Sequence, residues 1–357
     1  MTVPVATRAR AASLEFRNVT KRYAGQATRG AVNDLSLQVP AGAICVLVGP
    51  SGCGKTTSLK MVNRLIEPTA GEILLDGANV LTEEVTALRR RIGYVIQQVG
   101  LFPHLTVGRN VAVIPNLVGW SEARQLARTD ELLSLVGLDP VQYRDRYPSQ
   151  LSGGERQRVG VARALAADPP LMLMDEPFAA VDPIVRERLQ DEFLRLQREL
   201  AKTILFVTHD IDEAIKMGDL VAVMEEGGHL AQFGPPDQIL AHPASDFVAR
   251  FVGADRGLKR LSLVTIGDLD LAPAPTRSGL PTFAAGTKLR DALSVLLVAD
   301  ARGGVALDDA GSPRGLVTVD VIAGALADDA PRPSHSGTSQ TLADGSGPSG
   351  AAEGGDS

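Results

Sequence analysis

Cysteine is scarce in this sequence, and long apolar runs and an excess of basic charge are missing. The two cysteines, Cys45 and Cys53, are too few for a disulfide framework or a plausible zinc site, and both fit a reducing compartment. No apolar run approaches the ~18 residues that a transmembrane helix needs, and Met1–Arg10 lacks the apolar segment of a secretory signal. If the protein works at a membrane, other chains must therefore span it.

Charge and size narrow the function classes further. The net charge of −6 and the pI of about 5.5 argue against broad nucleic-acid binding, although a local basic patch stays open. The chain has 357 residues, of which 44% are hydrophobic and 22% charged. This is enough for one large α/β domain and a small second unit.

Strand-like and helix-like segments alternate from Ser13 to about Ala241, as in a mixed α/β domain. Short continuous apolar runs predict strands that are buried on both faces. Helical apolar spacing, or a proline at the first turn, predicts helices. The predicted strands are Ala43–Val48, Leu171–Met174 and Thr203–Val207, and the predicted helices are Ser121–Val136 and Pro183–Leu200.

The C-terminal third is organised differently. Ser245–Arg260 predicts a helix that leads into a linker, and residues 262–326 predict a small β/α unit. Residues 328–357 are mainly Gly, Ser, Pro, Ala and Asp, so we expect a disordered tail. The elements predicted in the small unit are a helix over Thr287–Ala299, strands over Gly304–Leu307 and Gly315–Thr318, and a turn at Asp309–Gly311.

A phosphate-binding loop follows the first predicted buried strand. The stretch Gly49–Thr56 matches the P-loop pattern and lies between a strand and a helix, as that motif requires. Its glycines let backbone N–H groups surround an anion, and Lys55 is predicted to reach the β- and γ-phosphates while Thr56 ligates Mg²⁺. A glycine-rich turn without a ligand is the alternative. The predicted nucleotide-binding residues are Gly49, Pro50, Ser51, Gly52, Cys53, Gly54, Lys55, Thr56 and Thr57.

Because Cys53 lies inside this loop, an adduct on its thiol is expected to collide with the nucleotide. We therefore expect alkylation to inhibit ATP hydrolysis and bound MgATP to protect. A P-loop by itself leaves kinases, GTPases, helicases and transporters open.

A second anion-binding helix start lies at Leu151–Val159. Ser152 is a suitable N-cap, and Gly153 and Gly154 leave the first amides of the helix unobstructed. One nucleotide does not need two helix N-termini from a single chain, so we expect each subunit to offer this face to the nucleotide of its partner. The alternative is an ordinary capped helix.

This stretch resembles the LSGGQ signature of the ABC transporter ATPase family, with Glu155 in place of the usual glutamine. We do not expect that departure to affect function. The resemblance covers about Leu14 to Val252 and implies a homodimer that sandwiches ATP and Mg²⁺. It also implies a P-loop α/β fold with a mixed sheet core and an inserted helical subdomain at about residues 98–165.

Two carboxylates end the predicted strand Leu171–Met174. Asp175 is predicted to hold Mg²⁺ and Glu176 to orient or deprotonate the attacking water, the alternative being mere solvated charge. The resemblance implies further roles. Asp182 matches the D-loop at the dimer interface, and His209 matches the switch histidine at the γ-phosphate.

Two further matches leave rivals open. Tyr23 matches the aromatic residue that stacks on adenine, the rival being a surface or core tyrosine. Gln97 matches the glutamine that contacts Mg²⁺ or the lytic water, with Gln98 as the neighbouring alternative.

Met61–Thr69 and Gln97–His104 resemble the osmoprotectant branch of the ABC importers, which carries glycine betaine, choline, carnitine or proline betaine. The implied partners are a membrane permease and an extracytoplasmic binding protein, with this subunit at the cytoplasmic face of the plasma membrane. We expect Leu101, Phe102 and Leu105 to be exposed and to contact the permease, the alternative being packing within the helical subdomain.

The C-terminal unit resembles a single CBS domain in Asp291–Leu297, Gly304–Leu307 and Gly315–Thr318. Val321 stands where the acid that binds a ribose is expected, with Asp320 one residue early, which argues against adenosine binding. We expect two copies of the unit to pair, either passively or as a sensor of ionic strength. The expected domains are the ATPase at 13–245, a linker at 246–261, the CBS-like unit at 262–327 and the tail at 328–357.

Other function classes fit less well. A DNA-repair ATPase with this signature needs a coiled coil or zinc modules between its motifs, and a translation-associated ABC protein needs two motif sets. Neither feature is present in the sequence. An importer ATPase for another small solute, or a non-transport ABC ATPase, stays open as the alternative.

Overall fold

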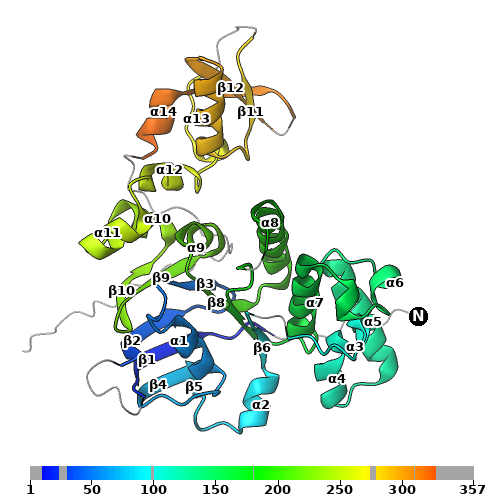
Figure 1. The fold of residues 1–357 in the computed structure, drawn as a ribbon. Coiled ribbons are helices and arrows are strands. Elements are labelled where there is room, and N and C mark those ends of the chain that lie inside the picture. Colours follow the sequence, from blue (N-terminus) through cyan, green and yellow to red (C-terminus); the bar gives the residue numbers. More distant parts are fainter. Residues whose placement is uncertain are drawn as a thin grey trace, which may run out of the picture.

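The computed structural model describes residues 10–23, 30–97, 100–179, 181–273, 279–308 and 310–326 (Figure 1). The tail expected to be disordered at 328–357 lies outside these residues. Among them, no helix combines the length and apolar character that crossing a lipid bilayer requires.

A six-stranded sheet forms the centre of the larger unit, in the order β10-β9-β3-β8-β7-β6. All neighbouring pairs are parallel except β10 and β9. An antiparallel sheet, β2-β1-β4-β5, lies beside it. The strands of both sheets are β1 (Leu14–Lys21), β2 (Val32–Val39), β3 (Ile44–Val48), β4 (Ala70–Leu75), β5 (Ala78–Asn79), β6 (Ile92–Val95), β7 (Leu171–Asp175), β8 (Thr203–Thr208), β9 (Leu220–Glu225) and β10 (His229–Gly234).

Helices cover the six-stranded sheet and form a separate layer at one side of it, which contains α3 to α7 (Figure 1). These helices fall within the helical subdomain expected at about 98–165, whose bounds stay a prediction. The helices of the larger unit are α1 (Lys55–Val62), α2 (Val85–Arg90), α3 (Val107–Val111), α4 (Val113–Leu117), α5 (Glu122–Leu135), α6 (Pro140–Tyr143), α7 (Gly153–Leu165), α8 (Pro183–Leu200), α9 (Ile211–Met217) and α10 (Pro236–Ala241), with a short 3₁₀ turn at Pro148–Gln150.

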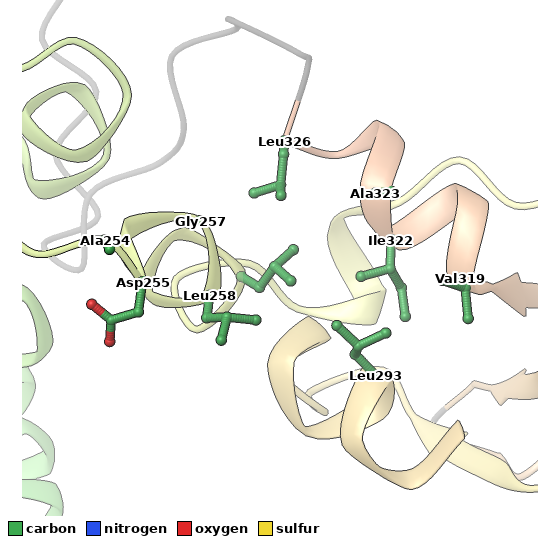
Figure 2. Close-up of a pocket in the computed structure, with 10 residues that line it drawn as sticks. Ala254, Asp255, Gly257, Leu258, Leu293, Val319, Ile322, Ala323 and Leu326 are labelled. Atoms are coloured by element: carbon green, nitrogen blue, oxygen red, sulfur yellow. The ribbon is translucent and has the colours of Figure 1, made fainter. Parts of the chain in front are cut away.

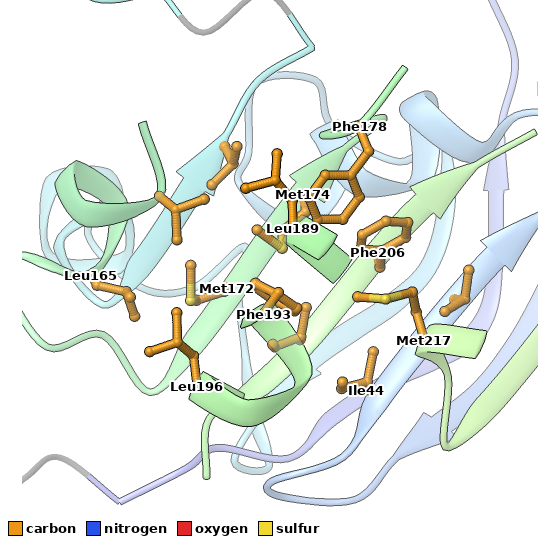
Figure 3. Packing of buried hydrophobic residues seen from close by; sticks show 14 of the residues in the cluster. Ile44, Leu165, Met172, Met174, Phe178, Leu189, Phe193, Leu196, Phe206 and Met217 are labelled. Carbon is orange, nitrogen blue, oxygen red and sulfur yellow. The ribbon is translucent and has the colours of Figure 1, made fainter. Parts of the chain in front are cut away.

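The central strands are buried on both faces, as their continuous apolar runs predict. On β3, Val46 faces the hydrophobic cluster that contains α8 and α9 residues, whereas Leu47 faces the cluster that contains α1 residues. On the first side, Phe178 packs edge-on against Phe193 of α8, with ring centroids 6.3 Å apart (Figure 3). This packing fixes the loop that follows β7 and so positions the residues at its end.

The segment expected to be one helix and a linker contains two helices, α11 (Asp246–Val252) and α12 (Arg256–Leu261). The expectation of one helix over Ser245–Arg260 is wrong because Gly253, at φ +91°, ends α11. Val252 is buried in the core of the larger unit, whereas Leu261 is buried in the core of the C-terminal unit. The two cores therefore meet between α11 and α12.

The C-terminal unit has a three-stranded sheet in the order β11-β12-β13, flanked by helices. It contains the predicted helix and the two predicted strands, together with β11 and α14, which we did not predict. Its elements are β11 (Thr282–Ala284), α13 (Leu289–Val298), β12 (Gly303–Leu307), β13 (Pro313–Thr318) and α14 (Val319–Gly324), with a 3₁₀ turn at Ile266–Asp268.

Candidate functional site

The carboxyl ends of four parallel strands meet at one edge of the central sheet. In the register of the sheet, Val48 at the end of β3 pairs with Thr208 of β8, and Asp175 of β7 pairs with Val207. β6 lies beside β7 and ends at Val95. The P-loop, the paired acids, His209 and Gln97 directly follow these ends, so the fold brings them to one edge.

The P-loop turns tightly into α1. Gly54 adopts φ +97° directly before α1, and a Cβ there would lie 2.2 Å from the carbonyl oxygen of Ala31, so no larger residue fits. The Lys55 side chain is buried and folds back on the loop, where its Nζ donates to the carbonyl oxygens of Gly49 and Pro50, both at 2.8 Å. The ammonium group is thus held within the loop that is predicted to surround the phosphates.

The position of Cys53 bears on the expectation that its thiol can be alkylated. Its side chain is fully buried, and its Sγ lies 3.6 Å from Lys55 Nζ, beneath the loop. Burial raises the pKa of this thiol. Because the sulfur faces the protein interior, we do not expect ready alkylation of Cys53 in the folded protein. Inhibition by an adduct and protection by MgATP stay predictions. Cys45 is also buried, as expected of a small core residue.

Thr56 and Asp175 form a pair of oxygen ligands. The Thr56 hydroxyl donates to Asp175 Oδ1 at 3.0 Å, which links the start of α1 to the end of β7. Burial raises the pKa of Asp175, and the Thr56 hydrogen bond opposes that shift. A hydroxyl beside a carboxylate fits Mg²⁺, which binds through one or two carboxylates together with substrate phosphates and water. These two side chains therefore fit the metal site predicted from the sequence.

Glu176 lies between two polar side chains from neighbouring strand ends. Gln97 Nε2 donates to Glu176 Oε2 at 3.0 Å, and His209 Nδ1 lies 3.2 Å from Glu176 Oε1. Glu176 adopts φ +45°, an uncommon left-handed conformation that its backbone hydrogen bond to Val207 holds in place. The three predicted catalytic residues thus meet. Gln98 lies outside the described residues.

Tyr23 follows β1 and takes no part in this cluster of polar contacts. The backbone N–H of Ala31 donates to the Lys21 carbonyl at 2.8 Å. Because Ala31 also abuts Gly54, the end of this hairpin borders the P-loop. The Tyr23 ring is 42% exposed, with Lys21 Nζ 5.3 Å from its centroid. An exposed aromatic ring is able to stack on a base.

The start of α7 explains the departure at Glu155. The Ser152 hydroxyl accepts from the Glu155 N–H at 3.3 Å, and Glu155 Oε2 accepts from the Ser152 N–H at 2.7 Å, which is a capping box. Tyr143 donates to the other Glu155 oxygen at 2.7 Å and holds the pKa of the carboxyl below its ordinary value. An acid at this position therefore strengthens the helix start.

Ser152 and Gly153 of the signature are exposed, and the start of α7 stands apart from α1 in the same chain (Figure 1). A Cβ on Gly153 would meet nothing within 4 Å, which leaves this helix start open to a partner. Asp182 caps α8 by accepting from the Ile184 N–H at 3.0 Å, so it has a structural contact within its own chain.

Sequence reasoning missed a polar cluster beside Glu176. Glu213 of α9 is 7% exposed, and its Oε1 accepts from Gln190 Nε2 of α8 at 3.0 Å. Arg186, one turn earlier on α8, donates to the carbonyl oxygen of Val181 at 3.1 Å. The only sequence signal is the spacing of Arg186 and Gln190, which puts both on one face of a helix.

Comparison with known proteins gives consistent results. A family model described as ABC transporter matches residues 32–179. The osmoprotectant import ATP-binding protein OsmV of Salmonella typhimurium is 49% identical over 307 residues, covering 85% of this chain and 78% of OsmV. The choline transport ATP-binding protein OpuBA of Bacillus subtilis is 53% identical over 243 residues, covering 68% of this chain but only 63% of OpuBA.

A solved structure is similar too. It is a dimeric ATP-binding cassette in a post-hydrolysis state, bound to ADP and Pi. The match has 32% identity and a TM-score of 0.56, and it covers 62% of this chain and 98% of the cassette.

Proposed function

The chain belongs to the ATP-binding proteins of ABC transporters, in the osmoprotectant uptake branch, and we propose that it is the ATP-hydrolysing subunit of an importer for a quaternary-amine osmoprotectant. The observation that carries this proposal is the meeting of Gln97, Glu176 and His209 beside the P-loop, in a chain that also presents an exposed LSGG helix start. The other small-solute importers of the family are the alternative.

The side chains at the sheet edge divide the chemistry among them. Lys55 binds the phosphates, and Thr56 and Asp175 hold Mg²⁺. When bound, the ion neutralises negative charge on the phosphate oxygens. Glu176 orients a water and accepts its proton, while Gln97 and His209 hold the Glu176 carboxylate in place through its two oxygens.

The proposed working unit is a homodimer. Ser152, Gly153 and Gly154 reach the nucleotide of the partner subunit, because a capped, unobstructed helix start on the surface is an anion-binding site. Asp182 lies at the same interface. The similar dimeric cassette with ADP and Pi supports this arrangement.

The permease is proposed to dock at the loop before α3. Asn110 is fully buried and shapes this loop, since its side chain bonds the backbone of Phe102 at both N–H and C=O and also reaches the carbonyl oxygen of Leu105. Leu101, Phe102 and Leu105 were all expected to be exposed, but only Phe102, at 43%, is; Leu101 and Leu105 are half-buried. The exposed apolar patch therefore consists of one aromatic residue. A rigid loop that presents one exposed ring suits contact with a membrane subunit.

The C-terminal unit is proposed to be a CBS-like module that pairs with its copy in the dimer. An apolar pocket of about 340 Å³ opens between α12, α13 and α14, lined by Leu258, Leu293, Ile322 and Leu326 among others (Figure 2). Exposed apolar side chains on α13, such as Val298, suit a second copy. At Val321 the helix offers no acid to a ribose, which supports pairing over adenosine binding.

The proposed site of action is the cytoplasmic face of the plasma membrane, with an extracytoplasmic binding protein as an indirect partner and no nucleic acid. The test is to co-express the chain with its permease, reconstitute the complex in proteoliposomes, and measure MgATP hydrolysis and uptake of glycine betaine, choline and carnitine. We expect ATP-driven uptake of at least one of them, and a Lys55→Ala control should abolish it. Uptake of an unrelated solute alone would favour the alternative.

A further inference from the structure

A cavity of about 40 Å³ lies beside Glu176 and His209, between the loop that follows β7 and the loop that follows β8. Glu176 and His209 line one part of it, and Arg186 of α8 and Glu213 of α9 line another. The proposed mechanism uses the first pair and gives no role to the second.

Glu213 is a buried acid whose contacts reach two functional segments. Its carboxylate accepts a hydrogen bond from Gln190 at 3.0 Å, and it lines the same cavity as Thr208, the residue directly before His209. Asp210 joins the two segments, because its N–H donates to the Thr208 hydroxyl at 3.1 Å and its carboxylate accepts from the Glu213 N–H at 3.3 Å. Burial raises the pKa of Glu213, while the polar groups of Thr208 and Gln190 and the charge of Arg186 lower it. A carboxylate buried at this cost needs such partners, so its position is fixed by them.

Arg186 and Gln190 continue this contact to the start of α8. They are four residues apart, so both face α9. Arg186 also donates to the carbonyl oxygen of Val181 at 3.1 Å, and Val181 precedes Asp182, which caps α8. The cluster thus joins the Val181–Asp182 turn, at the proposed dimer interface, to the segment that carries His209.

We propose that Glu213 is a positioning residue for ATP hydrolysis: it holds the Thr208–His209 segment against the α8 residues that fix the Val181–Asp182 turn. In the dimer, a partner that seats this turn thereby also sets His209 against Glu176. This inference rests on the proposed function, because it assigns Glu213 a part in that same reaction.

The test compares purified wild-type protein with Glu213→Ala, Glu213→Gln and Asp191→Asn. Asp191 is the matched control, because it lies next to Gln190 on α8 and pairs with Lys216 of α9 at 2.8 Å, yet is exposed and outside the cluster. We expect Glu213→Ala to lower kcat about 10²-fold, as displaced catalytic groups do. Glu213→Gln keeps an oxygen for Gln190 but loses its charge, so we expect a fall of about tenfold.

Two readouts separate positioning from a general loss of structure. The Kd for ATP should stay within about twofold in all variants, and Asp191→Asn should keep kcat within about twofold. In a His209→Ala background, measured by single turnover, Glu213→Gln should cause no further loss, because both changes disable the same element. A merely structural role of Glu213 gives additive losses instead.

Each outcome decides between the readings. A Glu213→Gln variant with wild-type kcat, or additive losses with His209→Ala, overturns the inference, and Glu213→Gln decides even when Glu213→Ala fails to fold. A wild-type protein that does not hydrolyse MgATP contradicts the proposed function itself. An active wild type with an indifferent Glu213 contradicts only this inference.

Discussion

Replacing Glu176 by glutamine should stop ATP turnover while leaving ATP bound. The change keeps the volume of the side chain and one oxygen, so Gln97 or His209, at 3.0 and 3.2 Å in the native site, still finds a partner. It removes only the carboxylate that is proposed to accept the proton of the attacking water. Loss of a general base costs about 10²–10⁴-fold in rate, which is about 2.7–5.4 kcal/mol of transition-state stabilisation.

The residues proposed to bind the nucleotide explain why ATP binding should survive. Lys55, Thr56 and Asp175 lie in the P-loop, in α1 and at the end of β7, and none of them bonds Glu176. ATP should therefore bind with nearly native Kd, and a dimer that closes on ATP but cannot hydrolyse it should accumulate.

Phosphate release under steady-state conditions measures kcat, equilibrium titration measures the Kd for ATP, and size exclusion with and without MgATP measures the dimer. Lys55→Ala is the control that should lose ATP binding, and Asp175→Asn is the control that should weaken Mg²⁺ binding and so raise the Mg²⁺ concentration needed for turnover. Near-native turnover in Glu176→Gln would remove Glu176 from the role of base. Loss of ATP binding would instead show that the carboxylate supports the loop.

Three further predictions test the interface, the thiol and the C-terminal unit. A composite site is formed by the P-loop of one chain and the signature of its partner, so mixing Ser152→Arg subunits with Lys55→Ala subunits puts both lesions at one site and leaves the other intact. Mixed dimers should therefore hydrolyse more ATP than either homodimer. Equal activity, together with failure of a crosslink between the signature and the P-loop of opposite chains, rejects the trans arrangement. Cys53, fully buried, should react with iodoacetamide only at the rate of local opening, with ATPase activity retained meanwhile; rapid labelling of the folded protein contradicts the described orientation. Truncation after Gly253 should remove the dependence of uptake on internal salt in proteoliposomes, and an unchanged dependence argues for a passive pairing module.

The elements that position the site were predictable from local patterns. Ala43–Val48 and Thr203–Val207 are short continuous apolar runs rich in Val, Ile, Leu and Phe, which are typical of strands buried on both faces. Parallel strands with helical connections then bring their carboxyl ends to one edge, which is why Glu176 and His209 could be expected to meet. Their roles in the reaction stay predictions.

The misses arose where tertiary packing decides. A P-loop pattern fixes the backbone of Cys53 but does not say which way its side chain points. Gly253 inside an apolar-periodic stretch costs a helix only about 1 kcal/mol, so the sequence alone does not predict a break there. From the sequence, Glu213 is expected to be a solvated helix residue, because no local pattern indicates that it is buried and hydrogen-bonded to Gln190, which is 23 residues away.

Helix α9, which follows His209, is contacted by both α8 and α12. Lys259 of α12 is buried, and its ammonium bonds the carbonyl oxygen of Val252 at 2.9 Å and the Asp212 carboxylate of α9 at 3.1 Å. Asp212 directly precedes Glu213 in the first turn of α9, and this turn begins two residues after His209. Because α12 also contributes Leu261 to the core of the C-terminal unit, one helix contacts both that core and the turn that contains Glu213. The C-terminal unit is thus connected, through Lys259 of α12, to the first turn of α9, which lies next to His209 in the sequence.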